Sequence, residues 1–128
     1  MDQFEVQKTN SKTCGNPQIK LIDFAEILSA LPKSQRDKLI SDYDMRSFKK
    51  IFDDGGMMQT IEVFLASGMN ISRTARILYM HRNTLIYKLN AIRKLTGLDL
   101  REFDMAATFK LLHTLYVLNN RGIYENKN

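Results

Sequence analysis

The chain has 128 residues, a hydrophobic fraction of 44%, and 19 Lys and Arg against 14 Asp and Glu, which gives a net charge of +5. This is enough for one domain with a packed core, or for one domain with a tail. No apolar run could span a bilayer, the N-terminus lacks a secretory-signal pattern, and the single Cys14 cannot form an internal disulfide. We therefore expect a cytoplasmic protein without a membrane partner.

The first third of the chain is predicted to be a tail followed by helices. Residues 1–18 are polar and aperiodic, and we expect them to be a disordered N-terminal tail. Apolar residues then recur at helical spacing over 19–31, and Pro32 should end this helix. We expect residues 19–56 to form a helical lead-in and dimerisation region that ends at the turn 53–56.

Two further helices are expected inside this lead-in region. Ser34 and Asp37 form a weakened capping box, which predicts a helix that runs through Leu39, Ile40 and Tyr43. Asp44 is placed to cap a short helix over 45–52.

The second half of the chain is predicted to be a helical domain over residues 57–119. A helix over 57–67 should end at Gly68, where a left-handed cap needs no Cβ. A last amphipathic helix is expected over 102–119, followed by a polar C-terminal tail over 120–128. No strand-type alternation is present, so the predicted fold class is all-α.

Between these helices, residues 70–97 hold two short helical patterns with a very tight break at 79–82. The inward-facing residues at helical spacing are Ala75 and Leu78 on the first pattern, and Leu85, Leu89 and Ile92 on the second. Ser72 is predicted to cap the first helix, and Gly97 to end the second, at about 82–96. This spacing is typical of a helix-turn-helix.

The same stretch concentrates positive charge. Residues 63–98 contain no Asp or Glu, and their six basic residues exceed the net charge of +5 of the whole chain. The basic residues of this acid-free window are Arg73, Arg76, Arg82, Lys88, Arg93 and Lys94. A local basic face with helix-turn-helix spacing predicts double-stranded DNA as the partner.

The helix-turn-helix pattern assigns expected roles, because its second helix enters the major groove with its N-terminal residues against the bases. Arg82, Asn83 and Thr84 begin that helix and are expected to read bases, since Arg pairs with guanine and Asn with adenine. Ile86 and Tyr87 are expected to touch thymine methyls and sugar-phosphate. The expected phosphate-binding residues are Ser72, Arg73, Arg76, His81, Lys88, Arg93 and Lys94. His81 has the alternative role of capping the second helix.

Residues 70–100 resemble the C-terminal helix-turn-helix of the PucR/CdaR family of bacterial transcription regulators. The most specific part is His81-Arg82-Asn83-Thr84-Leu85, with Tyr87, Leu89 and the run Thr96-Gly97-Leu98-Asp99-Leu100. Similarity to the Fis-type helix-turn-helix is more distant. The resemblance implies a multi-helix bundle that contains a Fis-like helix-turn-helix, binds DNA as a homodimer and controls transcription. Relatives often have an Arg between Leu85 and Tyr87, where this chain has Ile86.

Two other functions remain open from the sequence. One is a weakly selective, Fis-like architectural DNA-binding protein; the other is a helical module that docks a partner protein through Leu21 to Phe52 and the last helix. No nucleophile, base and oxyanion donor converge, so we do not expect an enzyme. No cluster of Cys, His and carboxylates has ligand spacing, so neither a metal, another cofactor nor a small-molecule ligand is expected.

Overall fold

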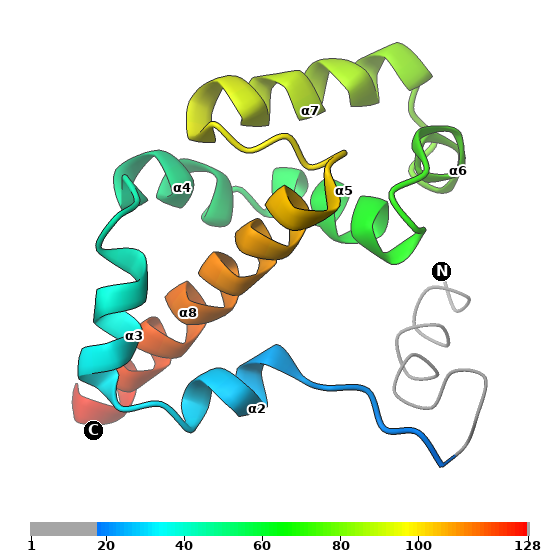
Figure 1. Cartoon of the computed structure of the whole chain (residues 1–128). Helices are drawn as coiled ribbons and strands as arrows, with labels where there is room; N and C mark the ends of the chain where they lie inside the picture. The colour runs from blue at the N-terminus through cyan, green and yellow to red at the C-terminus, as the bar shows by residue number, and fades with distance from the viewer. Residues whose placement is uncertain (1–17, 128) are drawn as a thin grey trace.

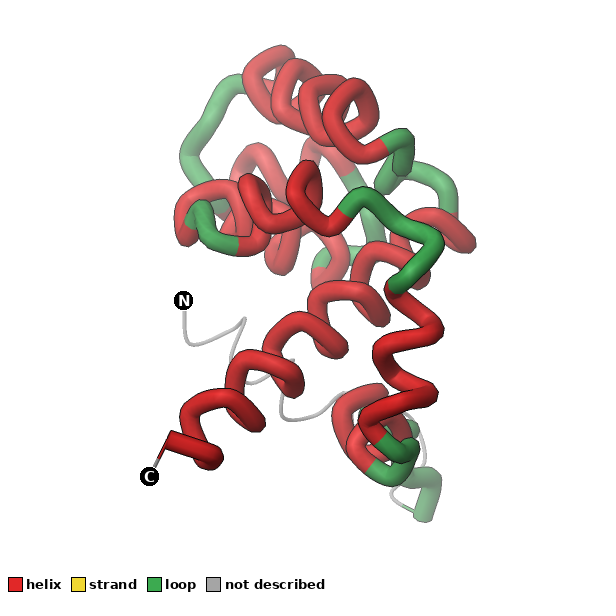
Figure 2. Tube along the Cα trace, turned by 90° about the vertical axis from the view of Figure 1, so that its left-hand side faces the viewer, coloured by secondary structure: helices red, strands yellow, loops and turns green. Residues whose placement is uncertain are grey.

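The computed structural model describes residues 18–127, and in this range it contains helices and no strands (Figures 1 and 2). The helices are α2 (Phe24–Ser29), α3 (Lys33–Ile40), α4 (Met45–Phe52), α5 (Gly55–Ala66), α6 (Ile71–Ile77), α7 (Arg82–Thr96) and α8 (Phe103–Lys127). The all-α prediction is confirmed. The predicted tail over 1–18 lies outside the described residues except for its last position. No helix in the described range has both the length and the hydropathy that a membrane span needs.

The core is formed by the inward faces of α4, α5, α7 and α8. Phe64, Leu85, Leu89 and Leu100 have no solvent exposure, and they come from α5, α7 and the loop before α8. α4 packs against both α5 and α7, and α6 packs against α5 and α7. Helices from both predicted regions, 19–56 and 57–119, therefore contribute to one core. The division into a lead-in region and a DNA-binding domain stays a prediction.

An aromatic cluster joins α4 to α8. The ring of Phe52 lies 5.3 Å from that of Phe109 and 5.2 Å from that of Tyr116, measured between centroids. The Tyr116 hydroxyl donates a hydrogen bond of 2.7 Å to Asp53 Oδ1, at the end of α4. This hydrogen bond and Lys49 hold the pKa of Asp53 below its usual value. The cluster fixes α8 against the core on which α7 rests.

α8 is long enough to serve two parts of the fold. Its first half packs into the core through Phe109 and Leu112. The helix also packs against α2 and α3. Lys110 Nζ lies 5.3 Å from the ring centroid of Phe24 on α2, within the range of a cation–π contact.

Several predicted helix ends are confirmed. Asp44 caps α4, accepting a hydrogen bond from Arg46 N, and α4 covers the predicted residues. Gly68 and Gly97 have φ of +74° and +83°, in the left-handed region where Gly carries no Cβ penalty.

Other predicted ends are wrong. The first helix begins at Phe24 rather than near residue 19, because Asp23 accepts from Ala25 N and acts as its cap. The capping box at Ser34 is also wrong: α3 begins earlier, after Pro32, with no side-chain cap. Asp37 instead forms a 3.0 Å ion pair with Lys33.

The first and last helices of the predicted domain are longer than expected. α5 begins at Gly55 because Asp54 accepts from Met57 N, so the two glycines belong to its first turn. α8 continues to Lys127, and the region predicted as a polar tail is helical up to that residue.

Candidate nucleic-acid interface

α6 and α7 form a helix pair with a very short connection. In Figure 1, α6 is seen nearly end-on while α7 lies across the view, so the two helices cross steeply. Asn70 caps α6, with its Oδ1 accepting a 2.8 Å hydrogen bond from Arg73 N. The prediction of Ser72 as the cap is therefore wrong, since Ser72 lies within the first turn of α6 and is exposed.

The turn after α6 has the hydrogen bonds of a Schellman motif. Met80 N donates to Ala75 O at 2.9 Å, and Tyr79 N donates to Arg76 O at 3.2 Å. The same motif ends α5, where Gly68 has the left-handed conformation. In the turn after α6 that position is held by Tyr79, with φ of +53° and a side chain that is 94% exposed. Nothing in the sequence pattern indicated a role for Tyr79.

α7 begins at the predicted residue, and His81 is its cap. His81 Nδ1 accepts a hydrogen bond of 3.3 Å from Asn83 N. The alternative of a capping role is thus confirmed, and phosphate contact stays a prediction. Arg82, Asn83 and Thr84 form the first turn of α7, and all three are exposed.

The outward face of α7 follows from its buried face. Leu85, Leu89 and Ile92 are buried against the core. With 3.6 residues per turn, the stripe opposite them consists of Asn83, Tyr87, Asn90 and Lys94, all exposed.

The remaining predicted residues of α7 flank this stripe. Arg82, Ile86 and Arg93 lie on one side, and Thr84 and Lys88 on the other. Ile86 is half-buried. Of the predicted base-reading residues, Asn83 and Tyr87 therefore lie on the outward stripe, whereas Thr84 lies on one side of it and Arg82 and Ile86 on the other.

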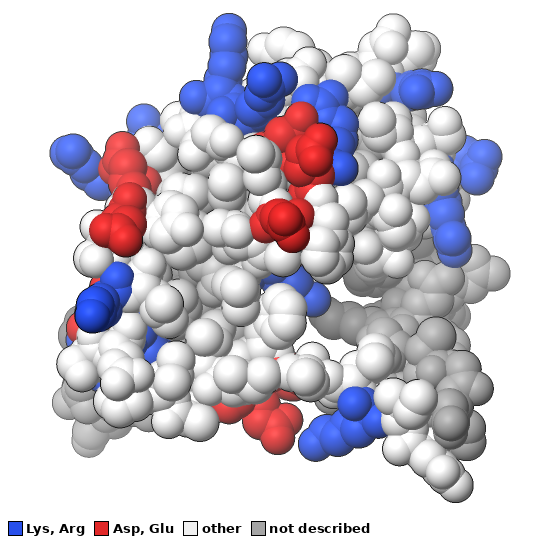
Figure 3. Space-filling view, viewed as in Figure 1, with Lys and Arg blue, Asp and Glu red and all other residues white. Residues whose placement is uncertain are grey.

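The basic residues of the acid-free window make no ion pair with the acidic side chains that the structure describes, although Arg93 lies close enough to Asp99 to help lower the pKa of that carboxyl. Among the side chains of residues 18–120, the ion pairs lie outside 63–98, for example between Lys49 and Asp53 at 2.9 Å. Figure 3 shows Lys and Arg side chains along the upper edge, over α7, and along the right-hand edge, over α6, with Asp and Glu below. Because these cations make no ion pair in the described range, an anion could bind them without first displacing an acidic side chain.

A polar network that was not predicted connects α7 to the loop after it. Arg101 Nη2 donates a 2.8 Å hydrogen bond to Asn90 Oδ1. Arg101 is in turn held by Asp99, with 2.7 Å from Nε to Oδ1 and 3.3 Å from Nη2 to Oδ2. The Arg101 guanidinium holds the pKa of Asp99 below its usual value, so this carboxylate stays charged.

The sequence contained one signal for Asn90, which recurs at helical spacing with Asn83 and Tyr87. It contained none for Arg101, because contact with Asn90 depends on how the loop after Gly97 folds back.

Two short helices with a tight turn, of which the second turns an exposed polar stripe away from the core, define a helix-turn-helix protein. Residues 57–117 match the family model described as the PucR C-terminal helix-turn-helix domain. The family resemblance is confirmed: this part of the chain is a helix-turn-helix domain of the PucR type.

Two bacterial proteins are similar to parts of the chain. The chain is 32% identical to the purine catabolism regulatory protein of Bacillus subtilis over 89 residues, which cover 70% of this chain and 17% of that protein. It is 41% identical to the carbohydrate diacid regulator of Escherichia coli over 56 residues, or 43% of this chain and 14% of that protein. The matches thus span less than a fifth of each relative. No solved structure gives a significant match.

Proposed function

We propose that this protein is a DNA-binding transcriptional regulator in which α7 enters the major groove of double-stranded DNA. One observation carries the proposal: the exposed stripe of α7 lies in a window of six cations that has no acidic residue. An α-helix fits the major groove, and unpaired Lys and Arg beside it supply the phosphate contacts on which affinity depends.

The geometry supports a division of tasks between bases and phosphates. The first turn of α7 carries Arg82, Asn83 and Thr84, which we assign to base edges because side chains there reach furthest into a groove. Tyr87 follows one turn later on the same face, with 74% of its surface exposed. Ile86 is assigned to a thymine methyl at the edge of the contact.

Phosphate binding is assigned to residues around this face. On α6 these are Ser72, Arg73 and Arg76, all exposed. Around α7 they are His81, Lys88, Arg93 and Lys94, of which Lys88 is half-buried and the others are exposed. A side chain at the edge of a recognition helix meets the DNA backbone more readily than the bases.

We further propose that the protein acts as a homodimer on two half-sites and regulates genes rather than catalysing a reaction. Both relatives carry names of regulators. A protein that binds chromosomal DNA in this way works in the cytoplasm.

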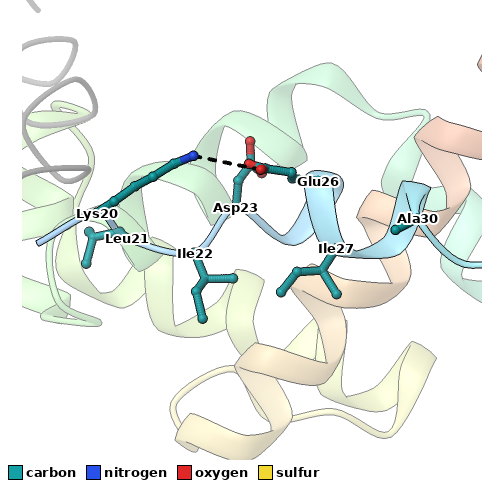
Figure 4. A pocket seen from close by; sticks show the side chains of 7 residues that line it. All are labelled: Lys20, Leu21, Ile22, Asp23, Glu26, Ile27 and Ala30. Carbon is teal, nitrogen blue, oxygen red and sulfur yellow. Dashed lines mark ion pairs between the residues drawn. The ribbon is translucent and has the colours of Figure 1, made fainter.

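The dimer contact is assigned to the lead-in region. Ile22 and Ile27 are 71% and 50% exposed, and with Leu21 they line an open groove along α2 (Figure 4). Lys20 and Glu26, 3.8 Å apart, also line this groove and carry opposite charges. A second copy related by two-fold symmetry could therefore bury the apolar row and exchange these charges.

The proposal is tested with two arginine variants and a competition between selected and random DNA. Arg82→Ala should reduce discrimination between the two, by about 1–3 kcal/mol for a lost bidentate guanine contact. Arg93→Ala should weaken binding to both by a similar factor, because it removes a phosphate contact. Equal losses from the two substitutions would contradict this division of tasks. Equal affinity of the unmodified protein for unrelated fragments would instead favour an architectural role.

A further inference from the structure

Asn90 lies on the outward stripe of α7 between Tyr87 and Lys94, yet it differs from the other polar residues of that stripe. Its side-chain oxygen is already engaged, at 2.8 Å from Arg101 Nη2. An arginine side chain has five N–H donors and no acceptor. The Asn90 amide must therefore turn its oxygen towards Arg101 and leave its NH2 group for another partner.

Arg101 is itself fixed, so it can hold this orientation. Its Nε and Nη2 both reach the carboxylate of Asp99, and its backbone N–H donates to Asp99 Oδ1 at 3.0 Å. The two side chains retain only 29% and 21% of their exposure. Asp99 and Arg101 thus form a braced pair at the start of the segment that leads into α8.

We propose that Asn90 is a specificity-determining residue that Arg101 locks as a hydrogen-bond donor, and that it selects a base with an acceptor in the major groove. The inference rests on the proposed function, because it requires α7 to lie in that groove. A free Asn prefers adenine, which it binds through both its oxygen and its nitrogen. Because the hydrogen bond from Arg101 fixes the direction of the Asn90 oxygen, the amide is not free to turn both its oxygen and its nitrogen to the edge of adenine.

The base preferences follow from the groove edges. Guanine offers acceptors at O6 and N7, thymine offers O4, and adenine offers only N7 to a pure donor. Cytosine presents its N4 amino group, which is a donor and repels a second donor. Asn90 should therefore favour guanine or thymine, accept adenine less well, and reject cytosine.

Selection of bound sequences from a random DNA pool tests the inference, using the full chain and three variants. Asn90→Ala should make one position of each half-site degenerate. Asn90→Asp keeps an oxygen towards Arg101 but presents an acceptor to the base, so cytosine should become preferred there, by about tenfold. Arg101→Met should release the amide of Asn90, and adenine should become the preferred base at the same position.

Arg46→Met is the matched control, because Arg46 is a highly exposed arginine on α4 that lies outside the acid-free window. It should select the same sequence as the unmodified protein. Circular dichroism checks folding, and if Arg101→Met does not fold, the two Asn90 variants still decide the question.

A position that changes to cytosine in Asn90→Asp and loses its preference in Asn90→Ala supports the inference. Unchanged preferences in both variants, while the unmodified protein selects a clear sequence, would overturn it and leave the proposed function standing. If the unmodified protein enriches no sequence, the proposed function fails and the inference fails with it.

Discussion

The hydroxyl groups of Ser67 and Thr74 lie 2.7 Å apart in the interior, where they join the end of α5 to α6. Each hydroxyl also contacts a carbonyl of its own segment, Val63 O at 2.6 Å and Asn70 O at 2.7 Å. Two hydroxyl hydrogens cannot serve three contacts at once. Because both carbonyls already accept a backbone N–H, either hydroxyl can donate to the other without leaving a carbonyl unpaired. This pair fixes α6 in the orientation from which the turn leads into α7.

The first prediction concerns the energetic coupling of this pair. Ser67→Ala and Thr74→Val should each lower the free energy of unfolding by about 1 kcal/mol, since each removes a buried hydrogen bond. The double variant should lose less than the sum, by about 0.5–1.5 kcal/mol. Urea unfolding of the four proteins measures the coupling. Strict additivity would mean that the two hydroxyls do not interact.

The second prediction concerns the left-handed Tyr79. A non-glycine residue in this conformation costs about 1–2 kcal/mol. Gly avoids this cost, but it loses about 0.5–1 kcal/mol more in chain entropy on folding. Tyr79→Gly should therefore raise the free energy of unfolding by about 0.5–1 kcal/mol, and thermal unfolding measures it.

The matched control is Tyr87→Gly, which removes another exposed tyrosine but from the middle of a helix. It should lower stability, by about 0.5 kcal/mol, because Gly is a poor helix former. If both substitutions destabilise the protein, Tyr79 is not strained.

The third prediction concerns His113, which is half-buried on α8 with its ring centroid 5.1 Å from that of Phe52. Burial lowers the pKa of His113, and Glu62 opposes this only in part. The folded state therefore favours the neutral imidazole. The resulting stability is present above the unfolded-state pKa of about 6.5 and is lost as the pH falls through the lower folded-state pKa.

The midpoint temperature of thermal unfolding should thus fall as the pH is lowered from about 7.5 to about 5, a range that spans the unfolded-state pKa of about 6.5. His113→Gln should flatten this dependence because it removes the titrating group. His81→Ser, which replaces the cap of α7 by another capping residue, should leave the His113 contribution in place. An equal slope in His113→Gln and the unmodified protein would rule out this origin.

The helices that the sequence predicted well have a clear capping residue at one end. α7 begins at Arg82 and ends before its predicted cap Gly97. α4 begins directly after its predicted cap Asp44. The first helix was extended too far because Leu21 and Ile22 continue the apolar spacing, although Asp23 stops the helix. Periodicity alone does not locate a cap.

The site was predictable where it depends on position along one helix. Arg82, Asn83 and Tyr87 are exposed on α7 as expected. The role of Asn90 was not predictable, because it depends on Arg101, which only the folded loop brings near. The left-handed conformation of Tyr79 was not predictable either, since a left-handed tyrosine gives no signal in a sequence.

The fourth prediction concerns the dimer contact. Ile22→Asp places a charge among the apolar residues Leu21, Ile22 and Ile27 of the groove and should shift the protein towards the mass of a single chain in sedimentation experiments. Binding to DNA with two half-sites should then weaken more than binding to a single half-site. Phe103→Asp is the control, since Phe103 is 73% exposed but lies at the start of α8. If both variants keep the mass of the unmodified protein, the assigned contact is wrong.

The central claim is that the acid-free face of α6 and α7 binds the DNA backbone while α7 lies in the groove. It is tested most directly by titrating double-stranded DNA with the unmodified protein at several salt concentrations and following fluorescence anisotropy. The five Lys and Arg side chains that we assign to phosphates predict a slope of log affinity against log salt concentration of about −4.5 per chain. A slope near zero, or no binding at low salt, would contradict the account.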